Sequence, residues 1–174
     1  MVQSSTTSAT LVTAPRSEIS NVYRDGIVAG LLGAGTIALW FFILDLFSGR
    51  PFYTPSLLGS ALFRRGIALD QAETLAVSFE MVLIYTWVHG MVFCVVGGLA
   101  SKLLAVAEQN LNLGFGILLL FVVFEFGFVG VAFIFFEPVL HALTWPAILV
   151  GNLLAAAVMA AYFWRRRPML TIEP

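Results

Sequence analysis

The chain has 174 residues, of which 60% are hydrophobic and 11% are charged, with a mean hydropathy of +0.95. A soluble domain is about half apolar and about one quarter charged, so this composition excludes a soluble globular protein and indicates an integral membrane protein. The net charge of −1, without a dense basic block, also excludes nucleic acid as a partner.

The first 25 residues are rich in Ser and Thr and lack periodic hydrophobicity, so residues 1–25 are predicted to be a disordered leader. The first long apolar segment follows at residues 27–47. Its apolar core is longer than the 7–15 residues typical of a signal peptide, and no small-residue cleavage site follows it. We therefore expect this segment to be retained as a membrane span.

Three more segments, near residues 75–104, 113–136 and 139–164, are also long enough to cross the membrane. A helix needs about 20 apolar residues to cross a hydrocarbon core of about 30 Å. None of the segments alternates in polarity as a lipid-facing barrel strand would. The sequence predicts an all-α integral membrane protein, with one domain of four transmembrane helices in a bundle at residues 26–166 and a tail at 167–174.

The segment between the first and second spans contains a predicted short helix. Thr54 and Pro55 suit the N-cap and first turn of a helix, and Leu57, Leu58, Ala61 and Leu62 recur at helical spacing after them. We expect an amphipathic interfacial helix, serving either as a spacer or as a lid over an outer site. Pro51 precedes this helix, and Tyr53, Arg64 and Arg65 would stay with headgroups and water.

Small residues give two spans a smooth face. Gly26, Gly30 and Gly33 lie on the inner half of the first span, and Gly151 and Ala155 lie on the fourth. Such faces allow close approach of another backbone. The pattern leaves open whether these faces meet each other, a second copy of the chain or other membrane subunits.

The basic residues predict the orientation in the membrane. Six fall on one side of a four-span arrangement and three on the other, so the first side is expected to be cytoplasmic. Both termini would then be cytoplasmic. The six are Arg16, Arg24, Lys102, Arg165, Arg166 and Arg167, and the three are Arg50, Arg64 and Arg65.

Ionisable residues in and beside the spans fall into two layers. Asp45, Glu80, Glu137 and His141 lie near the outer ends of the helices. Carboxylate and imidazole groups suit a transition metal such as iron, zinc or manganese, and helical bundles build such sites from facing side chains. These four residues are therefore a candidate metal site. The alternative for Glu137 and His141 is ordinary helix-end chemistry at the membrane interface.

A deeper layer contains His89 and Glu125, which are candidates for a proton relay or for a buried polar pair that fixes helix register. Single-histidine ligation of haem or chlorophyll by His89 is a further alternative, because Gly90, Gly97 and Gly98 would leave room for a macrocycle.

The segment DLFSGRPFYTPSLLG, Asp45 to Gly59, together with WVHGMVFCVVGGLASKL, resembles a family of small four-span bacterial membrane proteins that share a D-x-x-x-G-R-P-x-Y-T-P-x-x-L-G segment. The resemblance implies a four-helix protein of the bacterial inner membrane and implies no activity. Two hypotheses follow. The preferred one is a non-catalytic membrane subunit or binding protein with a possible metal site of carboxylate and histidine residues on the outer side. The alternative is a membrane metalloenzyme or proton-coupled permease that uses the same acidic and histidine residues.

Overall fold

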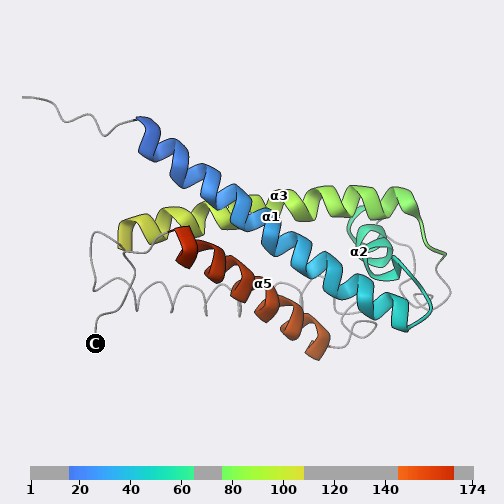
Figure 1. The fold of residues 1–174 in the computed structure, drawn as a ribbon. Helices are drawn as coiled ribbons and strands as arrows, with labels where there is room; N and C mark the ends of the chain where they lie inside the picture. Colours follow the sequence, from blue (N-terminus) through green and yellow to red (C-terminus); the bar gives the residue numbers. More distant parts are fainter. Residues whose placement is uncertain (1–15, 65–75, 108–144, 167–174) are drawn as a thin grey trace, which may run out of the picture.

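The computed structural model describes residues 16–64, 76–107 and 145–166. The described chain forms four helices: α1 (Arg16–Phe47), α2 (Tyr53–Phe63), α3 (Phe79–Ala107) and α5 (Trp145–Arg166) (Figure 1). Within these ranges there is no strand, so the all-α class is confirmed. Three stretches are long and apolar enough to cross a membrane: Ser20–Phe47, Phe79–Val106 and Pro146–Arg166.

Several predicted segments lie outside the described residues. They are residues 1–15 of the leader, Arg65, the third predicted span at 113–136, residues 139–144 of the fourth, and the tail at 167–174. The described chain therefore contains three of the four predicted spans.

The structure departs from the predicted leader at residues 16–25, which belong to α1. At 1.5 Å per residue the 32 residues of α1 extend about 48 Å, well beyond the hydrocarbon thickness. Contacts from the neighbouring helices hold this extension. The buried hydroxyl of Ser101, on α3, donates a hydrogen bond of 2.7 Å to the carbonyl of Val22. Local composition predicted disorder because these tertiary contacts are not visible in it.

Helices α1 and α3 approach so closely that their backbones touch. A Cβ atom added at Gly26 would lie 2.6 Å from the Cα of Gly98 and 2.7 Å from the carbonyl oxygen of Gly97. A Cβ at Gly30 would meet the backbone of Phe93. The small residues of α1 thus lie against α3, and the two helices cross obliquely in Figure 1.

Helix α5 packs antiparallel to α1. Near one end, Gly151 lies under the indole of Trp40, which donates a hydrogen bond of 2.9 Å to the carbonyl of Ala147. Near the other end, Ala29 of α1 forms a buried cluster with two residues of α5, Met159 and Phe163. Gly33 also contacts Met159, and Ala155 is buried.

Large apolar side chains cover the outer faces of these helices. On α3 they recur every four residues and are between 62% and 72% exposed at Phe79, Leu83, Trp87 and Val95. Such a stripe on a long helix suits contact with lipid chains, because apolar surface of this extent is unfavourable in water.

Candidate functional site

The C-terminal end of α1 is closed by a tight turn that follows directly from the sequence Ser48-Gly49-Arg50-Pro51. The amide of Gly49 donates to the carbonyl of Leu46 at 3.0 Å, and the amide of Arg50 donates to that of Asp45 at 2.9 Å. This pair of bonds is a Schellman motif, in which the residue after the helix is left-handed. Gly49 has φ of 69°, which costs glycine little, and Pro51 then prevents the helix from continuing.

The turn brings α2 back to the Asp45 side chain. Asp45 Oδ2 accepts a hydrogen bond of 2.8 Å from the amide of Thr54, and Oδ1 accepts one of 2.6 Å from the Thr54 hydroxyl. Both residues are buried. We call this pair the Asp45–Thr54 clasp. Since the carboxylate satisfies a free amide at the start of α2, Asp45 acts as a helix cap supplied from another helix.

The clasp corrects the predicted start of α2. Thr54 was expected to be the N-cap, but the helix begins at Tyr53 and its N-cap is Phe52, with φ of 64° and no side-chain cap of its own. Tyr53 was expected among headgroups, but its side chain is buried, with 8% exposed. The Arg50 guanidinium carbon lies over the Tyr53 ring, 4.2 Å from the ring centroid. Pro51 is exposed and Pro55 is half-buried.

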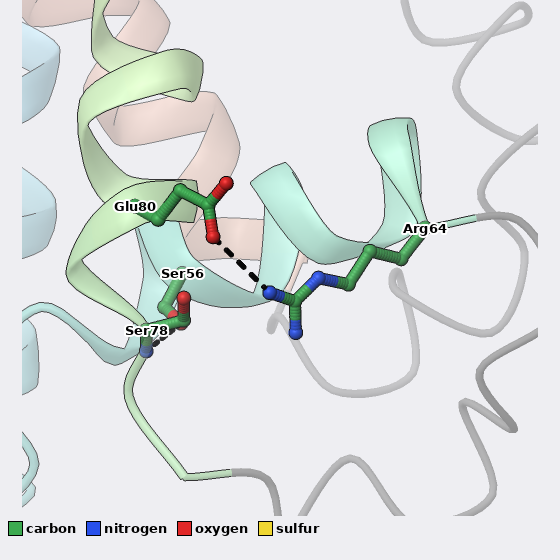
Figure 2. Close-up of polar contacts among 4 residues, drawn as sticks. All are labelled: Ser56, Arg64, Ser78 and Glu80. Carbon is green, nitrogen blue, oxygen red and sulfur yellow. Dashed lines mark hydrogen bonds and ion pairs between the residues drawn. The ribbon is translucent and has the colours of Figure 1, made fainter.

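Helix α2 packs against α3 through small and polar residues. The Ser56 hydroxyl accepts a hydrogen bond of 2.9 Å from the amide of Ser78, which precedes α3 (Figure 2). A Cβ at Gly59 would lie 2.5 Å from the carbonyl oxygen of Met81. The buried residues of α2 recur at helical spacing, at Tyr53, Ser56, Leu57 and Ser60. Of the expected apolar residues, Leu57 is fully buried, whereas Leu62 is 41% exposed.

Glu80 projects from the start of α3 toward the end of α2, where its carboxylate lies 3.5 Å from the Arg64 guanidinium (Figure 2). Both side chains are largely exposed, at 43% for Arg64 and 69% for Glu80. Asp45, in contrast, is buried and bonded to Thr54. Among the residues that the structure describes, no three metal-ligating side chains lie together. Glu137 and His141 are outside them.

His89 lies on α3, about 15 Å along the helix from its first residue. Its ring stacks on Tyr85, with centroids 5.5 Å apart, and lies tilted against Phe93, with centroids 4.7 Å apart. The imidazole is hydrogen-bonded to the backbone of Ala34 on α1. Its Nε2 atom is buried and has no hydrogen-bond partner in the described part of the chain. Its predicted partner Glu125 lies outside that part.

The surroundings of His89 bear on the haem and chlorophyll alternative. A macrocycle bound through Nε2 needs free space at that atom, but Nε2 is covered. Gly97 was expected to leave room for the macrocycle, but the backbone of α1 occupies the space beside it. Gly90 and Gly98 have open space. The described helices therefore do not present His89 to a macrocycle.

A polar cluster that was not predicted from the sequence lies where the N-terminal part of α1 meets the C-terminal end of α5. Asp25, on α1, accepts a hydrogen bond of 3.3 Å from the Tyr162 hydroxyl and lies 4.0 Å from Arg166 Nε. The Arg166 guanidinium also lies 5.7 Å from the Tyr162 ring centroid. Asp25 was assigned to the leader and so was not considered. An acid at the same membrane depth as several arginines was the available signal.

Together, the fold and these contacts define a helical integral membrane protein. No family model matches the sequence, and no curated protein or solved structure shows significant similarity to it.

Proposed function

We propose that the protein is a non-catalytic subunit or binding protein of a bacterial inner membrane, with four spans and both termini in the cytoplasm. The observation that carries this proposal is the Asp45–Thr54 clasp. Asp45 is a buried member of the predicted outer site, and both of its oxygens already accept hydrogen bonds from Thr54. A metal would have to displace these bonds.

The other described acids support the same conclusion. Asp25 joins α1 to α5 through Tyr162 and Arg166, and Glu80 joins α3 to α2 through Arg64. The ionic and polar groups thus connect helices. The large exposed surfaces are apolar and suit lipid chains or other membrane subunits.

A double-mutant cycle with metal analysis tests the proposal. Asp45→Asn removes one of the two acceptors, and Thr54→Val removes the hydroxyl donor with little change of volume. We expect each variant to lower the free energy of unfolding by about 1–3 kcal/mol, because buried polar groups lose their partners. The double variant should lose less free energy of unfolding than the two single variants lose in sum. Unfolding in mixed detergent micelles measures these free energies.

Glu80→Gln is the matched control, because its carboxylate is exposed and an exposed ion pair contributes at most about 1 kcal/mol. Mass spectrometry for metals is run on every variant. A stoichiometric transition metal that is lost in Asp45→Asn and retained in Thr54→Val would show that Asp45 is a metal ligand and not only a structural group, and would favour the metalloenzyme alternative.

A second candidate function is proton transfer across the membrane, favoured by the buried Nε2 of His89, for which the described residues supply no hydrogen-bond partner. Its test is proton flux into proteoliposomes that contain a pH-sensitive dye, with wild type, His89→Phe and the neighbouring control Tyr85→Phe. A proton carrier would lose flux in His89→Phe and keep it in Tyr85→Phe. Wild-type vesicles that are no leakier than empty ones would eliminate this candidate.

A further inference from the structure

The last two turns of α5 carry a shallow groove of about 360 Å³, lined by Ala160, Ala161, Trp164 and Arg165. These positions fall on one side of the helix, one turn apart. The two alanines form an apolar floor, the indole of Trp164 is 66% exposed, and Arg165 is at the polar end. The groove therefore runs from hydrocarbon toward the membrane surface.

The two adjacent arginines differ in their surroundings. Arg166 is paired with Asp25 and lies over Tyr162. Arg165 is exposed and has no ion-pair partner among the residues that the structure describes. Its charge is therefore available to a ligand, whereas that of Arg166 is already engaged by the fold.

This end of the bundle is positively charged. The hydrogen bond from Ser101 to Val22 brings the end of α3, with Lys102, beside the start of α1, with Arg24. Lys102 and Arg24 are both exposed. The contacts of Tyr162 with Asp25 bring the end of α5 to the same place. A basic surface of this kind attracts anionic headgroups.

We propose that the groove binds an anionic phospholipid. The phosphate pairs with the Arg165 guanidinium, an acyl chain lies along Ala160 and Ala161, and the Trp164 indole flanks the glycerol region. Each contact uses a matching chemistry: guanidinium with phosphate, small apolar side chains with an acyl chain, and an amphipathic ring at the interface. This inference requires only that α5 crosses the membrane, and it does not depend on the function proposed above.

Native mass spectrometry of the full chain in detergent tests the proposal. Phosphatidylglycerol and phosphatidylcholine with identical acyl chains are titrated separately, and the fraction of protein with one bound lipid gives the affinity. We expect wild type to prefer phosphatidylglycerol. Arg165→Gln should lower that affinity about fivefold, as expected for the loss of one basic residue near an anionic lipid.

Two matched variants separate a defined site from diffuse attraction. Arg166→Gln makes the same change in net charge and should lower the affinity less than about twofold, because Arg166 is already paired. Arg24→Gln replaces this control if thermal unfolding shows that Arg166→Gln is misfolded. Ala161→Phe fills the groove without changing the charge and should weaken the binding of both lipids.

Three results would overturn the proposal. The first is equal affinity of wild type for the two lipids, and the second is an equal loss in Arg165→Gln and the charge-matched control. The third is unchanged binding in Ala161→Phe. If glycerol phosphate, which has no acyl chain, competes as strongly as the lipid, the site binds phosphate alone and the lipid assignment is wrong.

Discussion

Gly97 and Gly98 are neighbours on α3 with opposite surroundings. A Cβ at Gly97 would meet the backbone of Gly26 and Gly30 on α1, whereas a Cβ at Gly98 would meet nothing within 4 Å. The close contact of the two helices therefore depends on the first glycine and not on the second. The atoms that a methyl group at Gly97 would meet belong to the backbone of α1, which cannot move aside as the end of a flexible side chain can. The methyl group must therefore separate the two helices.

We expect Gly97→Ala to lower the free energy of unfolding by about 1–3 kcal/mol or more, as overpacking does. Gly98→Ala should be neutral or stabilising by up to about 1 kcal/mol, because alanine has the higher helix propensity. Unfolding in mixed detergent micelles compares the two variants. Equal effects would show that the α1–α3 contact is looser than described.

At the residue scale, the sequence identified polar residues in and beside the spans but did not predict their partners. Asp45 was expected near the C-terminal end of the first span and lies there in α1, but its bond to Thr54 depends on a left-handed Gly49 turn that reverses the chain. Asp25 was missed because its partners, Tyr162 and Arg166, are more than 130 residues away in sequence. Periodicity and composition carry no information on contacts at that separation.

At the element scale, α2 is attached at its start, middle and end, but by bonds of unequal strength. The Asp45–Thr54 clasp is buried, the Ser56–Ser78 bond is partly buried, and the Arg64–Glu80 pair is exposed. Water and salt compete most effectively with the last. Local opening of α2 should therefore begin at its C-terminal end.

We expect Asp45→Asn and Ser56→Ala to accelerate amide hydrogen exchange in α2 by about fivefold to tenfold, which corresponds to a loss of about 1–1.4 kcal/mol in local stability. Arg64→Gln should change exchange by less than about twofold, because its pair is exposed. Exchange measured by mass spectrometry on the peptide that contains α2 tests this order. Faster exchange in Arg64→Gln than in Asp45→Asn would contradict it.

The existence of α2 was predictable, because Thr54, Pro55 and the leucines that follow have helical signals. Its packing was not. The face against α3 contains Ser56, Gly59 and Ser60, and such residues suggest exposure to water when only hydrophobicity is considered. Close packing of helices in a membrane favours small residues, so the same face is suitable for contact with α3.

At the scale of the whole molecule, hydropathy and segment length were sufficient to predict the fold class, since three described helices can span a membrane. The arrangement of these helices was not predictable, because it depends on which glycines meet which backbone. Four of the described cations, Arg24, Lys102, Arg165 and Arg166, lie at one end, which the proposed topology places in the cytoplasm.

We expect single cysteines at both termini, Ser5→Cys and Thr171→Cys, to be protected from a membrane-impermeant thiol reagent added to intact cells, because four spans return the chain to the cytoplasm. Each is placed in a Cys94→Ala background and compared with Gly49→Cys, where the turn should be labelled if the variant folds. Labelling of only one terminus would indicate an odd number of spans.

The crossing of α1 and α3 also contains the only thiol of the chain. The Cα of Cys94 lies 2.9 Å from the position that a Cβ of Gly30 would occupy, and the side chain is half-buried. Separation of the two backbones would expose more of this half-buried side chain, so an increase in the rate at which a small, membrane-permeant alkylating agent modifies the thiol would report loosening of the contact. Cys94 is therefore a natural probe of the close contact between α1 and α3. Its alkylation can be measured in native membranes without any introduced label.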